Sequence, residues 1–206
     1  MKKEVWVLGG GGHAKVAVAT LQSAGWTVAG IYDDDPSKQG RQVLSAKIVG
    51  ATPELDSWQT EPRAAFIAIG ENSVRARVAE LPADWVVAQH ETAFVHPSVS
   101  VGGGTLICAG VVIQPDTRIG QHVIANTSCS IDHDCIVQDF AHIAPGVTLT
   151  GGVHIGEGAF VGAGSTILPG VKIGAAATIG AGSVVLRDVD AGAKVVGVPA
   201  RNLAND

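Results

Sequence analysis

The hydrophobic residues in the second half of the chain recur with a period of six. From Val95 to Val185, sixteen positions spaced six apart are Val, Ile or Leu, with a single exception at Ala125. The residue four places after each of the first fifteen is always Val, Thr, Ala, Ser or Cys. Glycine often follows the aliphatic position directly, as at Gly102 and Gly120. The phase holds throughout without an insertion.

A fixed short period of this kind is typical of a solenoid. Six residues accommodate one short strand and one corner, with the aliphatic side chain inside the shaft and small residues at the tight turns. Three such faces close a triangular coil of eighteen residues, so residues 95–184 predict five coils. With neighbouring coils roughly 4.8 Å apart, the shaft would be roughly 25 Å long.

The first ninety residues follow a different pattern, in which strand-like apolar runs alternate with stretches of helical spacing. This alternation predicts a small parallel α/β domain with about one mononucleotide-binding half. We therefore place a Rossmann-like domain at 1–90 and a β-helix with a C-terminal tail at 91–206. The predicted strands are Glu4–Leu8, Thr27–Tyr32, Lys47–Val49 and Ala64–Ile69, and the predicted helices are Ala14–Ala24 and Asn72–Leu81.

Composition and charge narrow the class of protein. Hydrophobic residues make up 46% of the chain but aromatic residues only 4%, which fits a narrow, regularly stacked core. The net charge of −5 and the lack of a basic run give no sign of nucleic-acid binding. Residues 1–10 lack the apolar stretch of a signal peptide or membrane span. Because Cys108, Cys129 and Cys135 form no close pair, we expect a cytoplasmic protein with reduced thiols.

The glycine turn after the first predicted strand fits a phosphate-binding loop. Gly9, Gly11 and Ala14 match G-x-G-x-x-A between a strand and a helix, where the backbone can approach a phosphate. Asp33 follows at about the spacing at which an acidic residue meets a ribose hydroxyl. Two alternatives stay open: a glycine turn that serves only packing, and an NAD-dependent oxidoreductase. The missing second nucleotide-binding half argues against the latter.

The segment Asp132-His133-Asp134-Cys135 is the sharpest candidate for catalysis. Acyl transfer needs a base, and histidine suits that role near neutral pH. The flanking carboxylates could hold its tautomer and raise its basicity. Because a residue eighteen positions later lies one coil above, the sequence predicts Gly151 over His133 and Gly152 over Asp134. Backbone N–H groups there could stabilise the oxyanion that forms when a thioester is attacked.

The remaining histidines and Cys135 allow rival interpretations. His133 alone could be a surface histidine with satisfied partners, and His122 and His154 are expected at ordinary surface positions. His142, in the sixth position of its hexad, could be a corner residue or a ligand contact. Zinc would need three histidines, two of them five residues apart in the γ-type carbonic anhydrases of this shape, whereas the intervals here are 11, 9 and 12. Cys135 could be a nucleophile, but its place in the repeat favours packing.

Several segments occur in the order found in one family of enzymes. They are GGGGHAKV (9–16), the aspartates 33–34, AIGEN (68–72), NTSCSIDHDC (126–135), HIAPG (142–146), the glycines 151–152 and GVPAR (197–201). The chain resembles the sugar O-acyltransferases related to sialic acid O-acetyltransferase, a group of hexapeptide-repeat acyltransferases. It is especially similar to bacterial N-acetyltransferases of UDP-linked 4-amino sugars. The likeness covers nearly the whole chain, and the HDC segment is its most specific part.

This resemblance implies a left-handed β-helix, a homotrimer with active sites between subunits, acetyl-CoA as co-substrate and no metal. It implies that His133 is the general base and that Asp134 raises its basicity. The implied contacts of acetyl-CoA are His142, Gly151, Ala163 and Ala181. The implied contacts of the nucleotide sugar are Gly10, Gly11, Gly12, His13, Asp33, Asp34 and Gly70. The all-glycine loop departs from relatives, which often have Ser or Ala there.

The resulting hypothesis is an acetyl-CoA-dependent N-acetyltransferase acting on the 4-amino group of a UDP-linked 4-amino-4,6-dideoxy sugar. Direct transfer is expected because no convincing nucleophile is present. Two alternatives change only the acceptor: O-acetylation of a sialic acid, or N-acetylation of a GDP- or dTDP-linked amino sugar. A third is not enzymatic, namely a nucleotide-sugar-binding scaffold built on an inactive β-helix.

Overall fold

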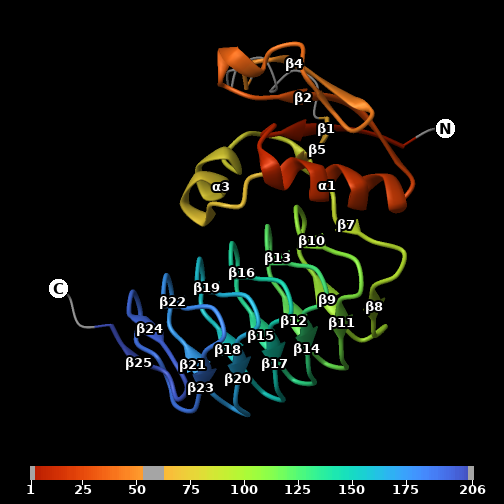
Figure 1. Ribbon diagram of the computed structural model, residues 1–206. Helices are drawn as coiled ribbons and strands as arrows, with labels where there is room; N and C mark the ends of the chain where they lie inside the picture. The colour runs from red at the N-terminus through yellow and green to blue at the C-terminus, as the bar shows by residue number, and fades with distance from the viewer. Residues whose placement is uncertain (1–2, 53–62, 204–206) are drawn as a thin grey trace.

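The computed structural model describes residues 3–52 and 63–203, and it shows two regions of different architecture (Figure 1). An α/β domain sits on one face of a three-sided parallel β-helix. The predicted combination of a Rossmann-like domain and a hexapeptide-repeat β-helix is confirmed. Among the described residues, no helix has the length and hydropathy of a membrane span.

The α/β domain is built on a six-stranded sheet with the order β3-β4-β2-β1-β5-β6. Neighbouring strands are parallel except for the β3–β4 hairpin. Every predicted strand and helix is present, but the short β3, η1 and β6 were not predicted because two or three residues carry no periodicity. The elements are β1 (Lys3–Leu8), α1 (Gly12–Ser23), β2 (Trp26–Tyr32), the 3₁₀ helix η1 (Pro36–Lys38), β3 (Gln42–Val43), β4 (Ala46–Gly50), β5 (Ala64–Ile67), α3 (Asn72–Val78) and β6 (Asp84–Trp85).

The two helices pack on opposite faces of this sheet, because side chains of β1 alternate between the faces. Val5 and Val7 belong to the core that includes the apolar face of α1. Leu8 packs instead with Leu81, which follows α3, in a separate cluster. This arrangement leaves the carboxyl ends of β1, β2 and β5 open at one edge.

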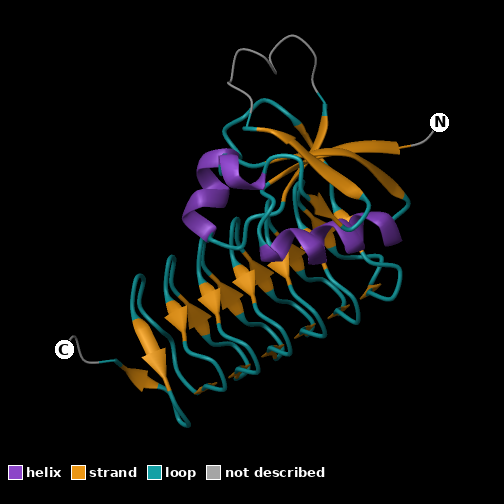
Figure 2. Ribbon diagram, turned by 45° about the horizontal axis from the view of Figure 1, so that its top comes forward, coloured by secondary structure: helices purple, strands orange, loops and turns teal. Residues whose placement is uncertain are grey.

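The β-helix stacks short parallel strands into three faces, and Figure 2 shows the successive coils side by side. The first face holds β7 (Ala88–Gln89), β10 (Leu106–Ile107), β13 (Ile124–Ala125), β16 (His142–Ile143), β19 (Phe160–Val161), β22 (Thr178–Ile179), β24 (Lys194–Val196) and the antiparallel β25 (Arg201–Asn202). The second holds β8 (Phe94–Val95), β11 (Val112–Ile113), β14 (Ser130–Ile131), β17 (Thr148–Leu149), β20 (Thr166–Ile167) and β23 (Val184–Val185). The third holds β9 (Ser100–Val101), β12 (Arg118–Ile119), β15 (Ile136–Val137), β18 (His154–Ile155) and β21 (Lys172–Ile173).

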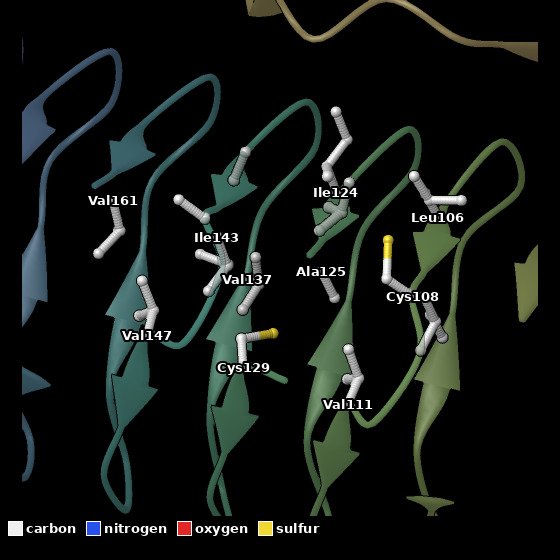
Figure 3. Close-up of a cluster of buried hydrophobic side chains, with 14 of the residues drawn as sticks. Leu106, Cys108, Val111, Ile124, Ala125, Cys129, Val137, Ile143, Val147 and Val161 are labelled. Carbon is white, nitrogen blue, oxygen red and sulfur yellow. The ribbon is translucent and has the colours of Figure 1, made fainter. Parts of the chain in front are cut away.

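The six-residue period positions the core of the shaft as predicted. The aliphatic positions from Ile107 to Val185 are at most 3% exposed, and partners eighteen residues apart pair directly, as Ile107 does with Ala125. The stack begins earlier than residue 95, at β7, and continues past Val185 to β24. Figure 3 shows Cys108 and Cys129 among these core side chains. Burial raises the pKa of the Cys108 thiol to about 11 and that of Cys129 to about 12.

From Gly104 to Gly182, each corner of the shaft uses one residue in the left-handed backbone region, three places after the aliphatic position. Six of these corner residues are not glycine, and for them the positive φ costs of order 1–3 kcal/mol each. The glycines that follow the aliphatic position serve close stacking instead: a Cβ on Gly156 would lie 2.5 Å from the backbone nitrogen of Ala175. The non-glycine corner residues are Asp116, His122, Ser128, Asp134, Phe140 and Ala176.

The α/β domain covers the early coils of the first face, where α1 lies across β7 and β10 (Figure 1). The outward side chains of Leu106 and Ile124 are consequently buried. The expectation that His122 is a surface residue is wrong for the same reason, since its side chain is 2% exposed. Its ring stacks on Phe140 and meets Trp85 edge-on, and burial lowers the pKa of His122 to about 4. His154 is half-buried.

Candidate functional site

The open edge of the α/β sheet forms a cavity of about 780 Å³. Ligands of open parallel sheets bind outside the carboxyl ends of the strands, and this volume suits a nucleotide-sized ligand. Among the residues predicted to bind the nucleotide sugar, the cavity is lined by Gly11, Gly12, His13, Asp33, Asp34 and Gly70.

The glycine loop at the mouth of α1 combines packing with open space. Gly9 has a φ of +100°, and a Cβ on Gly10 would lie 2.7 Å from the Cδ1 atom of Ile48. Nothing lies within 4 Å of a Cβ built on Gly11 or Gly12. Helix α1 begins at Gly12 with no side-chain cap, so its first N–H groups have no intrahelical partner and can bind an anion.

Asp33 ties this loop to the segment after β2. Its carboxylate accepts hydrogen bonds from the backbone N–H groups of Gly10 at 2.7 Å and Asp35 at 2.9 Å, and forms a salt bridge with Lys38. Burial alone would raise the pKa of Asp33, but these hydrogen bonds and the Lys38 charge hold it below its usual value. Both carboxylate oxygens therefore have partners within the chain, and the side chain helps to shape the cavity as well as line it.

Two cations of this cavity, Lys38 and Arg77, were not identified from the sequence. Lys38 ends the three-residue 3₁₀ helix η1, and Arg77 is one of two arginines on the short helix α3, so neither carries a distinguishing pattern. Their charges suit a diphosphate at the mouth of α1. Asp34, which lines the same cavity, accepts a hydrogen bond from the backbone N–H of Thr52 at 2.8 Å.

A second cavity, of about 620 Å³, lies where the α/β domain meets the first face of the β-helix. His13 and Gly70 line both cavities, so the two adjoin. His142, at the start of β16, contributes a side chain that is 9% exposed, with the Asn126 amide nitrogen 3.2 Å from its Nε2 atom. Burial, followed by the charge of Arg75, lowers the pKa of His142 to about 4. Its imidazole is therefore neutral at physiological pH.

His133 lies in the opposite electrostatic setting, on the exposed corner between β14 and β15. Its Nδ1 atom is 2.7 Å from a carboxylate oxygen of Asp134, and its backbone N–H donates to Asp132 at 2.8 Å. The hydrogen bond with Asp134, followed by the charge of Asp132, raises the pKa of His133. Because a carboxylate only accepts, the proton lies on Nδ1 and the lone pair of Nε2 is available to a substrate.

The predicted stacking of glycine over this histidine is confirmed. A Cβ on Gly151 would lie 2.6 Å from the Cε1 atom of His133, so only glycine leaves room for the ring. The N–H of Gly152 donates to the backbone carbonyl of His133 at 2.9 Å. Asp134 has a φ of +58°, the conformation shared by residues at this position of the hexad along the shaft.

A single chain does not bring all the predicted residues together. His133, Asp134 and Gly151 share the corner between the second and third faces, whereas His142 lies on the first face. Strand β15 of the third face separates the two groups within the coil. The remaining predicted contacts, on the corner between the first and second faces, are the exposed Ala163 and Ala181.

The rival chemistries find no support in this geometry. Cys135 is buried, its thiol donates to the Thr150 carbonyl, and burial raises its pKa to about 11, which disfavours the thiolate. Residues 3–52 and 63–203 contain no group of three or more His, Cys, Asp or Glu side chains placed to hold a metal ion.

Comparison with known proteins places this geometry in a family. Residues 4–81 match the PglD N-terminal domain, and residues 152–187 match the bacterial transferase hexapeptide (six repeats). The chain is 30% identical over 169 residues to GDP-perosamine N-acetyltransferase of Escherichia coli O157:H7, covering 76% of this chain and 74% of that protein. It spans only 23% and 16% of the length of two other curated relatives that it matches.

Two solved structures resemble the chain over nearly its whole length. A histidine-to-asparagine mutant of perosamine N-acetyltransferase from Caulobacter crescentus, in complex with CoA and GDP-perosamine, is 39% identical with a TM-score of 0.92, covering 100% of this chain and 99% of that one. The acetyltransferase domain of PglB from Neisseria gonorrhoeae FA1090, in complex with acetyl coenzyme A, is 33% identical with a TM-score of 0.90, covering 98% and 100%.

Proposed function

The chain belongs to the family of hexapeptide-repeat amino-sugar N-acetyltransferases with a PglD N-terminal domain, and on that premise we propose that it acetylates a nucleotide-linked amino sugar. The observation that carries this proposal is the His133–Asp134 pair beneath Gly151, in which Nδ1 of His133 is paired with Asp134 and Nε2 lies beside Gly151. The nucleotide-sized cavity at the mouth of α1 supports the proposal, because it offers a place for the nucleotide.

The proposed reaction is a direct transfer. The sugar amine attacks the thioester carbonyl of acetyl-CoA, and the new N–C bond gives a tetrahedral intermediate. His133 takes the proton that the attacking nitrogen loses, and the intermediate collapses as the C–S bond breaks. The CoA thiolate leaves and receives a proton from the His133 imidazolium, which restores the base. The backbone N–H of Gly151 would stabilise the oxyanion.

We assign the complete site to a homotrimer with active sites between subunits. The separation of His133 from the two cavities supports this, because a second copy could bring its corner to the first copy's first face. In this assignment His142, Gly151, Ala163 and Ala181 contact acetyl-CoA, and the glycine loop, His13, Asp33, Asp34 and Gly70 contact the nucleotide sugar.

The most specific part of the proposal is the base of the nucleotide. The sequence resemblance predicts UDP, whereas two of the relatives named above, those from Escherichia coli O157:H7 and Caulobacter crescentus, act on, or bind, GDP-perosamine. The residues that line the two cavities do not discriminate between uracil and guanine. We therefore propose UDP or GDP as the nucleotide, and the assay below distinguishes them.

The test is release of CoA from acetyl-CoA, followed with a thiol-reactive dye, in the presence of UDP-, GDP- and dTDP-linked 4-amino sugars and of sialic acid. We expect turnover with one amino sugar, its loss in His133→Ala, and its retention in the matched control His96→Ala, a histidine of the repeat outside both cavities. Turnover with sialic acid alone would replace N-acetyl by O-acetyl transfer. Unchanged turnover in His133→Ala would refute the assignment of the base.

A further inference from the structure

Arg75 of α3 is the largest fully buried side chain among the described residues, and its exposed fraction is only 1%. The described residues place no carboxylate in a salt bridge with it. Its charge is balanced instead by hydrogen bonds from all five of its N–H donors. A buried, unpaired charge is costly unless every donor is satisfied, so a site of this kind needs a reason beyond packing.

The five hydrogen bonds join the two regions of the molecule. Within the α/β domain, Arg75 donates to the carbonyls of Ile69 at 3.1 Å and Gly70 at 3.2 Å, and to the Asn72 side chain at 2.8 Å. In the β-helix, it donates to the carbonyls of His122 at 2.8 Å and Phe140 at 2.6 Å.

The contacts in the β-helix follow one corner from coil to coil. His122 and Phe140 are eighteen residues apart, and Asn72 extends the series by donating to the carbonyl of Gly158 at 2.8 Å. Three successive coils are thus bound by two neighbouring side chains of α3. Gly70, Asn72 and Gly158 also line the cavity that contains His142. The position of this cavity wall relative to the β-helix therefore depends on Arg75.

We propose that Arg75 is a positioning residue for acetyl transfer, which fixes the loop carrying Gly70 against the coils carrying His142. This inference rests on the proposed function, because it concerns the alignment of the bound nucleotide sugar with acetyl-CoA. Arg75 itself lines neither cavity and does not reach the reacting atoms. Small displacements of a remote positioning group can cost on the order of a hundredfold in rate.

The charge of Arg75 has a second, measurable effect on the same cavity. The charged and titratable groups around His142 are Arg75 and Glu71 from the α3 segment and His13 from α1. Burial and then Arg75 lower the pKa values of both His13 and His142. The pKa of Arg75 itself, lowered by burial to about 10, leaves it charged at neutral pH.

The decisive variants are Arg75→Lys, which keeps the charge without the planar fork, and Arg75→Gln, which removes the charge. The matched control is Arg41→Gln, an exposed arginine of the same domain. We expect kcat to fall about a hundredfold in both Arg75 variants with little change in the KM of the nucleotide sugar. By NMR titration, the pKa of His142 should rise in Arg75→Gln and stay low in Arg75→Lys.

Wild-type kcat in a folded Arg75→Gln protein, or full rescue by lysine, would overturn the proposal. If neither Arg75 variant folds, Asn72→Ala keeps Arg75 but removes its hydrogen bond to the Asn72 side chain and the contact with Gly158. A reduced kcat with an unchanged His142 pKa would then support the proposal, and a wild-type kcat would overturn it. If the wild-type protein acetylates none of the sugars, the proposed function fails. The titration of His142 in Arg75→Gln then decides the effect of Arg75, and an unchanged pKa would refute it.

Discussion

The corner that carries His133 and the cavity that contains His142 hold the same side chain in opposite states. At the corner, an exposed imidazole is hydrogen-bonded to Asp134, which raises the His133 pKa. In the cavity, burial and the Arg75 charge lower the His142 pKa to about 4. Only nine residues separate them in sequence. One is therefore suited to exchange protons near neutral pH, and the other to bind as a neutral imidazole.

This contrast predicts that replacing the two histidines changes different kinetic parameters. We expect His133→Ala to lower kcat by about a hundredfold or more, because the proposed general base is lost. His142→Ala should act mainly on the KM of acetyl-CoA. Steady-state kinetics with both substrates varied would separate these effects. Equal losses of kcat in the two variants would contradict the division of roles.

The corner can also be disrupted without changing the histidine. In Gly151→Ala the new methyl group would meet the imidazole of His133, so we expect kcat to fall between about tenfold and a hundredfold. Ala175→Ser, at the equivalent position of a later corner, is the matched control for folding and should retain activity. A Gly151→Ala enzyme with normal kcat would show that the ring need not lie beneath residue 151.

Removing the carboxylate partner should make the corner histidine more like the buried one. Asp134→Asn removes the hydrogen bond that raises the pKa of His133, so the acid limb of kcat/KM should move to lower pH. At neutral pH we expect a loss of about tenfold, because the weaker base accepts the proton less readily. An acid limb that stays in place would mean that another group controls it.

The smallest expected effect concerns stability in acid. His122 and His142 each titrate near 6.5 when unfolded but near 4 when folded. Their contribution to stability is therefore complete above pH 6.5 and is lost progressively as the pH falls toward 4. At pH 5.5 the loss should be about 1 kcal/mol for each residue. Urea unfolding of the wild-type protein and of His122→Phe at pH 7 and pH 5.5 would measure this loss. Between the two pH values, the free energy of unfolding should fall by about 1 kcal/mol less in the variant than in the wild-type protein. An equal fall in the two proteins would contradict the lowered pKa of His122.

The sequence predicts the features that follow from the eighteen-residue repeat. It does not predict those that require the α/β domain to pack on the β-helix. A strict period places Ile107 in the shaft and Gly151 over His133, because each coil has eighteen residues. The repeat does not predict that His13 lies near His142, because that contact requires the α/β domain to lie on the first face. The buried state of Arg75 was likewise missed, because its partners in the β-helix are backbone carbonyls, which any residue supplies.

The corner residues at positive φ are also difficult to predict from the sequence. They recur every six residues, but six of them are not glycine, so composition alone does not reveal the position. Asp134 is one of these, and its backbone conformation directs a carboxylate toward the adjacent histidine ring.

The uninterrupted eighteen-residue register also constrains how this protein can change its length. Deleting one hexad would turn every later residue by one face, and would carry the proposed acetyl-CoA contacts to a different edge. Deleting a whole coil would restore every edge and shorten the shaft by about 4.8 Å. The length of the shaft can therefore change only in steps of one whole coil if each residue is to stay on its face.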